Sequence, residues 1–405
     1  MRIIILSLIF IAFTIPTFSQ SSIQGKVVDA ETNEPIPFAN VFFSGTLVGT
    51  TTDVDGNFSL DFFSEGKYDL IIKFVGYQEY FRQVDSSEEI PFLDVTLNQE
   101  VIELKEVYVN ADTSGWENNY PSFKDLFLGR TENASKVEIA NPRDIFLYYD
   151  AVDNGLFAHS RKEIVIENKA LGYRMNYIMK DFQMHYRTGE FGSFGVPRFE
   201  ELESRGKARM KRWKKERKRA YLGSFNHFLN SLISNTFSEE GFIVQELHMI
   251  PNKKRPSQEL IDQKLSLFRG ELRSTGSVSL SIGGNTSNMD SIRLWSRLNR
   301  LPALIDSLGV KYTKNDDLVE LGKVINYKGY LRIIYTKEPE ENNYSLTRPG
   351  GGVDNKQTST VLFREPLKVY KNGYYDVGKV IFLGYFGWSS KIAEMLPLGY
   401  QPESE

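Results

Sequence analysis

The chain of 405 residues contains no cysteine, which excludes disulfide bonds, thiolate metal ligands, a cysteine nucleophile and a lipid-modified N-terminal cysteine. Histidine is scarce, with four residues: His185, His227 and His248 have no metal-ligand partner at helical spacing, and His159 has Glu163 four residues on. Neither His-Glu-x-x-His nor Gly-x-Ser-x-Gly occurs. We therefore assign no catalytic, cofactor-binding or metal-binding residue, and we expect no cofactor.

Long apolar segments are missing beyond the N-terminus. Arg2 is followed by a mostly apolar, uncharged run over residues 3–15, then by Pro16 and small side chains. A basic start, a short apolar core and a small-residue exit predict a cleaved signal peptide over residues 1–19. A retained anchor is the alternative, although a bilayer span needs roughly 20 apolar residues. We expect the mature chain to have no transmembrane segment and to work outside the cytoplasm.

Charge is nearly balanced overall, with 49 Lys and Arg against 52 Asp and Glu, but residues 205–221 are strongly basic. The segment 200–235 contains no proline and is predicted to be helical. Outside the cytoplasm such a run has no nucleic acid to bind, which leaves anionic lipid or polysaccharide. The candidate residues for this contact are Lys207, Arg209, Lys211, Arg212, Lys214, Lys215, Arg217, Lys218 and Arg219.

A structural role for this basic helix is the alternative. Four side chains recur at helical spacing and could pack on the protein while the charges stay in water: Met210, Trp213, Arg217 and Tyr221.

Residues 22–110 alternate between short apolar stretches and turn residues, which predicts an antiparallel β-sandwich. One turn, Asp53-Val54-Asp55-Gly56-Asn57, could also be a calcium loop. Counted from Asp53, however, glycine falls at position 4 and serine at position 12, where a calcium loop has glycine at 6 and glutamate at 12. Asp-Gly between alternating segments predicts a β-hairpin instead.

This region resembles the carboxypeptidase regulatory-like domain. In chain order, the motifs are Ile23-x-Gly25-x-Val27-x-Asp29, Glu34-Pro35-Ile36-Pro37-Phe38-Ala39-Asn40-Val41, Gly49-Thr50, Thr52-Asp53-Val54-Asp55-Gly56-Asn57-Phe58, Phe74-Val75-Gly76-Tyr77 and Leu104-x-Glu106-Val107-x-Val109. The resemblance implies a seven-stranded, transthyretin-like sandwich over residues 20–110. In Bacteroidota this module often precedes TonB-dependent receptors, and it brings no catalytic residues. The spacing of His159 and Glu163 also misses the His-x-x-Glu of zinc carboxypeptidases.

Beyond a linker at residues 111–115, residues 116–400 are predicted to form a larger α+β domain. Predicted strands include 163–167, 172–178, 181–186, 277–282 and 329–335, and a hairpin is predicted around Lys371-Asn372-Gly373, between strands at 367–370 and 380–383. Predicted helices cover 291–308, 316–321 and the segment from Trp388 to Leu396, and residues 343–360 are predicted to form a loop.

Parts of this region resemble a block of unassigned activity that follows the same sandwich in other secreted Bacteroidota proteins. The stretches are Phe127-Leu128-Gly129, Asn141-Pro142, Ile166-Glu167-Asn168-x-x-Leu171-Gly172-Tyr173, Tyr221-x-Gly223-Ser224-x-x-His227-Phe228-Leu229 and Met395-Leu396-Pro397-Leu398-x-Tyr400.

The sequence therefore predicts a secreted or envelope-associated, non-enzymatic binding or scaffolding protein of the periplasm or outer-membrane surface. Its partner would be an envelope protein, a glycan or an anionic lipid surface. The alternative is an extracytoplasmic hydrolase with its site in residues 115–400, because two converging carboxylates leave no sequence signature. A deep polar pocket would favour the hydrolase, and an aromatic surface or projecting basic helix would favour the binder.

Overall fold

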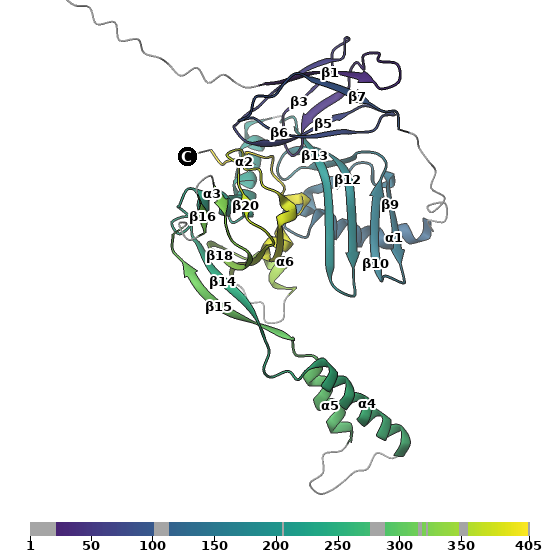
Figure 1. The fold of residues 1–405 in the computed structure, drawn as a ribbon, viewed down its shortest axis with the longest axis vertical. Helices are drawn as coiled ribbons and strands as arrows, with labels where there is room; N and C mark the ends of the chain where they lie inside the picture. The colour runs from purple at the N-terminus through teal and green to yellow at the C-terminus, as the bar shows by residue number, and fades with distance from the viewer. Residues whose placement is uncertain are drawn as a thin grey trace, which may run out of the picture. The chain divides into compact units, whose positions relative to one another are not determined.

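The computed structural model describes residues 22–100, 113–204, 206–275, 288–314, 318–320, 323–347 and 355–403. The predicted signal peptide and the motif Leu104 to Val109 lie outside them. The chain forms two compact units (Figure 1). Unit 1 consists of Met1–Asn226, Val369–Tyr375 and Ser389–Glu405, and unit 2 consists of His227–Lys368 and Asp376–Trp388.

Unit 1 begins with the predicted seven-stranded sandwich, which is confirmed. Its strands are β1 (Ser22–Asp29), β2 (Asn40–Phe43), β3 (Gly49–Thr51), β4 (Asn57–Asp61), β5 (Lys67–Lys73), β6 (Tyr80–Asp85) and β7 (Leu93–Leu97). They form one sheet in the order β4-β1-β7 and a second in the order β3-β2-β5-β6. Alternate side chains of both sheets fill a shared apolar core. The sandwich is not wholly antiparallel, because β1 and β7 run parallel.

The turn at Asp53 is present, but the predicted hairpin is wrong because β3 and β4 belong to different sheets. Asp53 Oδ1 accepts hydrogen bonds from the backbone N–H groups of Asp55 and Asn57 at 2.9 and 2.8 Å. Gly56 has a φ of +78°, and a Cβ atom there would lie 2.5 Å from the Val27 carbonyl oxygen. The residues of this motif thus turn the chain from one layer of the sandwich to the other.

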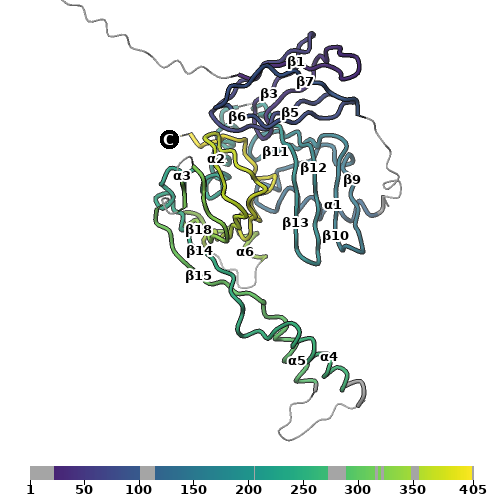
Figure 2. Tube along the Cα trace, in the orientation of Figure 1, coloured from purple at the N-terminus to yellow at the C-terminus, as the bar shows by residue number. Residues whose placement is uncertain are grey.

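The rest of unit 1 is a six-stranded sheet with helices. Its strands are β8 (Val137–Ile139), β9 (Ile145–Asp150), β10 (Gly155–Ser160), β11 (Ile164–Asn168), β12 (Tyr173–His185) and β13 (Glu190–Glu201). The order is β8-β11-β12-β10-β9, and β13 pairs with the other edge of β12 along its whole length. Helix α1 (Thr113–Leu128) lies against one face of this sheet (Figure 2). Its Phe123 and Phe127 pack there against Phe182. The 3₁₀ turns η2 (Asn133–Lys136) and η3 (Pro142–Asp144) complete this region.

The predicted strands of this sheet are confirmed, but the single helix over residues 200–235 is wrong. The segment contains the end of β13, then α2 (Lys207–Tyr221) and α3 (Phe225–Ile233). Gly223, with a φ of +73°, separates the two helices because a left-handed residue cannot continue a helix. Helix α1 begins at Thr113, within the segment predicted as a linker.

Unit 2 is built on a five-stranded antiparallel sheet. Its order is β15 (Leu304–Tyr312), β14 (Phe242–Pro251), β18 (Gly329–Pro339), β19 (Lys356–Phe363) and β21 (Val380–Gly384). Three short strands form a small second sheet, namely β16 (Val319–Glu320), β17 (Val324–Ile325) and β20 (Leu367–Lys368). Helices α4 (Gln258–Thr275) and α5 (Asn288–Asn299) lie in the chain between β14 and β15, and α6 (Asn342–Ser345) follows β18.

Several predictions on the C-terminal half are wrong. The helix predicted over 291–308 ends at Asn299, because Pro302 lacks the N–H group a helix needs and β15 follows. Val319–Glu320, predicted as helix, is strand β16. The segments 277–282 and 348–354 lie outside the described residues, whereas the ends of the predicted loop 343–360 belong to α6 and β19.

The helix and hairpin predicted near the C-terminus are also wrong. The segment from Trp388 to Leu396 contains the end of α7 (Tyr385–Ser389) and the turn η5 (Ile392–Glu394), since extended backbone at Lys391 interrupts them. The chain does turn at Lys371-Asn372-Gly373, followed by the 3₁₀ turn η4 (Val377–Lys379). The flanking strands pair elsewhere, β20 with β17 and β21 with β19. Asn372 Nδ2 donates instead to the Lys67 carbonyl oxygen at 2.6 Å.

Candidate functional site

Helix α2 exposes a basic face. Of the nine predicted contact residues, six are exposed to solvent, namely Lys207, Arg209, Lys211, Arg212, Lys214 and Lys215. Lys218 and Arg219 are half-buried, and Arg219 Nε donates to Glu216 Oε2 at 2.9 Å. Lys214 Nζ pairs with Glu403 Oε1 at 2.8 Å. The helix therefore keeps six cationic side chains in water.

Arg217 does not belong to this exposed face. Its guanidinium lies 3.9 Å from the ring centroid of Tyr173, and the side chain is buried. Its Nε donates to the Leu171 carbonyl oxygen at 2.7 Å, and its Nη1 bonds Glu201 Oε1 at 2.8 Å. Arg217 thus supplies donors to buried carbonyl groups, which is a structural role.

The packing stripe predicted for this helix is confirmed. Trp213, Arg217 and Tyr221 are buried, and Met210 is half-buried. Trp213 Nε1 donates to the Lys169 carbonyl oxygen at 3.0 Å. The indole lies against Gly172, where a Cβ atom would approach it to 2.2 Å.

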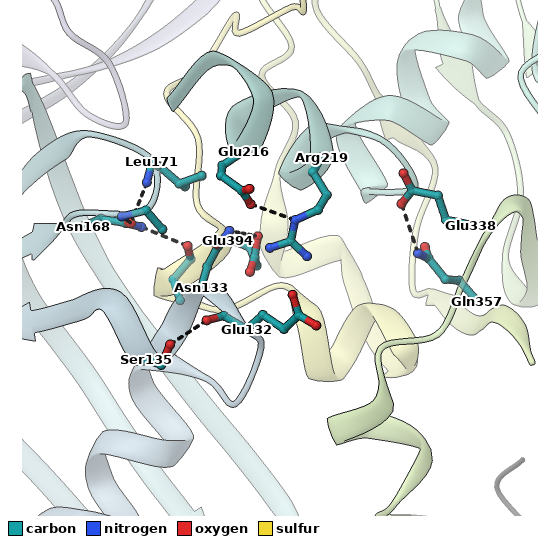
Figure 3. Close-up of polar contacts among 12 residues, drawn as sticks. Glu132, Asn133, Ser135, Asn168, Leu171, Glu216, Arg219, Glu338, Gln357 and Glu394 are labelled. Carbon is teal, nitrogen blue, oxygen red and sulfur yellow. Dashed lines mark hydrogen bonds and ion pairs between the residues drawn. The ribbon is translucent and has the colours of Figure 1, made fainter. Parts of the chain in front are cut away.

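A buried polar cluster lies beside α2 (Figure 3). Asn168 Oδ1 accepts from the Leu171 N–H at 2.9 Å, and its Nδ2 donates to the Ala393 carbonyl oxygen at 2.9 Å. Asn133 is fully buried, and its Nδ2 donates to Glu394 Oε2 at 3.0 Å. These bonds join residues 225 and 261 positions apart in the chain. The cluster therefore clamps the C-terminal segment onto unit 1.

The four histidines do not form one cluster, although His159 and His185 lie on the same face of the unit 1 sheet. His227 is buried at the start of unit 2, with Nε2 3.5 Å from Glu240 Oε2, and burial lowers its pKa below the usual 6.5. His248 Nε2 lies 3.3 Å from Glu246 Oε2. Within the described part of the chain, no group of three or more His, Asp or Glu side chains is placed to hold a metal ion.

An aromatic strip crosses the face of the unit 1 sheet opposite α1. It consists of Phe146 and Tyr148 on β9, Phe157 and His159 on β10, His185 on β12 and Phe194 on β13. Cross-strand register places the Phe146 ring on His159, with centroids 4.9 Å apart, and the Tyr148 ring on Phe157 at 5.1 Å. Phe157 in turn meets His185 edge-on at 5.5 Å. These contacts hold the rings in a fixed row.

The strip is open to solvent. Phe146, Tyr148 and Phe194 are 37, 39 and 54% exposed. Gly192 contributes no side chain beside Phe194. Gln183 is the residue paired with Gly192 in the register of β12 and β13. Sequence reasoning missed this surface, although the alternation of aromatic residues at 146, 148, 157 and 159 is visible in the sequence.

The N-terminal sandwich matches the family model described as a CarboxypepD_reg-like domain over residues 23–109. Residues 23–109 are a carboxypeptidase regulatory-like domain. The chain is also similar to two TonB-dependent receptors. It is 36% identical over 106 residues to TonB-dependent receptor P39 of Formosa agariphila, covering 26% of this chain and 10% of that receptor. It is 37% identical over 78 residues to TonB-dependent receptor SusC of Bacteroides thetaiotaomicron, covering 19% and 8%.

The chain thus spans about a tenth of the length of these receptors. A crystal structure of a protein from Bacteroides fragilis, described as membrane-associated and of unknown function, aligns over 90% of this chain and 94% of that one. At a TM-score of 0.15 and 9% identity, this likeness carries no conclusion. None of the described helices is long and apolar enough to span a membrane.

The carboxypeptidase regulatory-like domain packs on the same sheet face that carries the aromatic strip. Its Phe42 and Ile71 form an apolar cluster with Ile178 and Val196 of the sheet. The Gly45 N–H also donates to the Pro197 carbonyl oxygen at 2.6 Å. The domain therefore covers one part of this face, and the aromatic strip occupies another part that stays exposed.

Proposed function

We propose that the protein is an envelope-associated, non-enzymatic scaffold of the periplasm or outer-membrane surface, and that it docks a protein partner on the aromatic strip. The envelope location is supported by the carboxypeptidase regulatory-like domain and by its similarity to the N-terminal parts of TonB-dependent receptors. The basis for a docking role is the row of exposed rings.

The chemistry of the strip favours a protein over a small ligand. Aromatic side chains are enriched and charged ones depleted at the centres of protein interfaces, and charges gather at the rim. Here, Phe146, Tyr148 and Phe157 carry no charge, whereas Arg161 stands over Phe146 at 5.7 Å. Because the rings are already stacked in place, binding of a partner would cost little side-chain entropy on this surface.

Site-specific photo-crosslinking in the native host tests this proposal. A benzophenone amino acid at position 148 or 194 should yield a discrete protein adduct, because both side chains lie in the exposed strip. The matched control is Phe81 on β6, which is 60% exposed but lies outside the strip. Adducts at 148 and 194 that disappear in a Phe146→Ser background support docking. Equal labelling at all three positions, or none, contradicts it.

The basic face of α2 supports a second proposal, contact with an anionic envelope surface. A change of Lys211, Arg212, Lys214 and Lys215 to Glu should weaken salt-sensitive co-sedimentation with phosphatidylglycerol vesicles. Binding that ignores salt, or binding that survives the four changes, would contradict an electrostatic contact.

A further inference from the structure

The described chain between β14 and β15, residues 252–275 and 288–303, forms a helical arm. Helices α4 and α5 lie side by side beyond the ends of the two strands (Figures 1 and 2). Its base is fixed by hydrogen bonds. The Asn252 N–H donates to the Ala303 carbonyl oxygen at 2.9 Å, Asn252 Nδ2 donates to that of Pro302 at 2.9 Å, and Arg255 Nε donates to that of Leu301 at 2.8 Å. These hydrogen bonds join the two ends of the arm to each other where it meets β14 and β15.

The described part of the arm buries little of its own apolar surface. Ile261 and Leu265 of α4 are its only fully buried apolar side chains. Leu260 and Leu267, seven residues apart and so on one side of α4, are 38 and 48% exposed, and Leu294 of α5 is 50% exposed. Two helices packed on each other cannot cover apolar faces of this width, so each helix leaves part of its apolar face in water.

Helix α5 has a polar face of a particular kind. At 100° per residue, Arg293 and Arg297 fall within one narrow sector with the exposed Leu294 next to it. The half-buried Ile292 and Trp295 fall on the opposite side. Basic side chains beside an exposed leucine can meet the phosphate groups and the apolar boundary of a membrane interface at the same time.

The charge of the arm indicates which partner fits. Residues 252–303 contain nine Lys and Arg against four Asp and Glu, a net charge of +5 in a chain whose net charge is −3. Two copies of so basic a hairpin repel each other, which disfavours pairing into a four-helix bundle. An anionic lipid surface attracts the same charge and also takes up exposed leucine side chains.

We propose that the helical arm binds peripherally to an anionic phospholipid surface, with Leu260, Leu267 and Leu294 entering the interface and the arginines of α5 contacting phosphate groups. This inference relies on the proposed envelope location, but not on the aromatic strip or its partner. Failure of the photo-crosslinking therefore leaves it standing, and its own failure leaves docking at the strip standing.

The absence of cysteine makes the test direct. A Leu294→Cys variant of the full mature chain, labelled with the environment-sensitive dye NBD, is mixed with vesicles of phosphatidylglycerol and phosphatidylethanolamine. The emission should shift to the blue and brighten, and it should change little with phosphatidylcholine vesicles. The control is Val54→Cys on a turn of the sandwich, which is 72% exposed and should not respond.

Two further variants separate the apolar and electrostatic contributions. Leu260→Ser combined with Leu267→Ser should weaken vesicle binding on the order of tenfold. These side chains are partly exposed, so the fold should persist, which circular dichroism checks. Arg293→Glu with Arg297→Glu should remove the preference for anionic lipid. A dye response without vesicles that grows with protein concentration would overturn the proposal in favour of self-association, and no response to anionic vesicles would also overturn it.

Discussion

Lys391 gives a stability prediction whose sign depends on pH. Its ammonium lies 3.8 Å from the ring centroid of Phe191, and burial lowers the pKa of its side chain to about 8. Relative to the ordinary value of 10.5, this corresponds to a cost of about 3 kcal/mol for holding the charge in the fold. The cation–π contact returns about 1–2 kcal/mol. Lys391→Met, which keeps the apolar stem, should therefore raise the free energy of unfolding by about 1–2 kcal/mol near neutral pH.

The gain should vanish in alkali. Below about pH 8, Lys391 is protonated in both folded and unfolded chains, so the full cost is present. Between about 8 and 10.5, the unfolded chain binds more protons than the folded one, so the wild type becomes more stable as pH rises. The difference between wild type and variant should shrink across that window.

Urea denaturation of both proteins at several pH values measures this difference, and an NMR titration of the lysine side chain gives the pKa itself. The matched control is Lys211→Met on the exposed face of α2, which should change neither stability nor its pH dependence. A Lys391→Met variant that is less stable than the wild type at neutral pH, or a difference that does not vary with pH, would refute the reasoning.

Three further predictions concern packing and protonation. Arg217→Leu should destabilise unit 1 by about 2–3 kcal/mol in urea denaturation, because buried carbonyl groups lose their donors, while Lys215→Leu should have almost no effect. Gly172→Ala should cost at least about 2 kcal/mol, since φ is +74° and the new Cβ would meet Trp213; a neutral result would mean that the indole moves freely. The pKa of His227 is lowered by burial, so the unfolded chain binds more protons and thermal stability should fall as pH drops below about 6.5. His227→Phe should remove that component, and an unchanged pH profile would contradict it.

Local pattern was enough to predict one face of α2 but not the role of every residue on it. Spacing of 3.6 residues placed Trp213 and Tyr221 on the packed side. Arg217 shares that spacing. Because eight other candidate cations surround it in the sequence, it was also predicted to contact an anionic surface. Its buried role follows from the carbonyl groups of Leu171 and Gly172, which come from a strand connection 45 residues earlier. Such a partner has no signature near Arg217 in the sequence.

The same limit explains the turn at Asp53 and the aromatic strip. Asp53 and Gly56 fix a turn through bonds within five residues, so the turn could be predicted. Which sheet each flanking strand joins depends on partners elsewhere in the chain, so the hairpin could not. Likewise, Tyr148 and Phe157 become neighbours only through the register of β9 and β10. Alternation predicts which rings share a face of one strand, whereas a surface requires the pairing of several.

The groups that the described chain offers to solvent are the basis for proposing a binding protein in place of a hydrolase. A hydrolytic pair of carboxylates must face a space that the substrate can enter, with side chains free to exchange protons. In unit 1, the buried Asn133 and Asn168 are instead engaged in hydrogen bonds that hold the chain together. Asn133 and Asn168 bond to η5, so any change in them would release the C-terminal segment before it altered a reaction. The groups offered to solvent are rings on the sheet, cations on α2, and leucines and arginines on the arm. Under the proposed function, these groups are the contact surfaces, and they lie on separate elements, so each can be tested without the others.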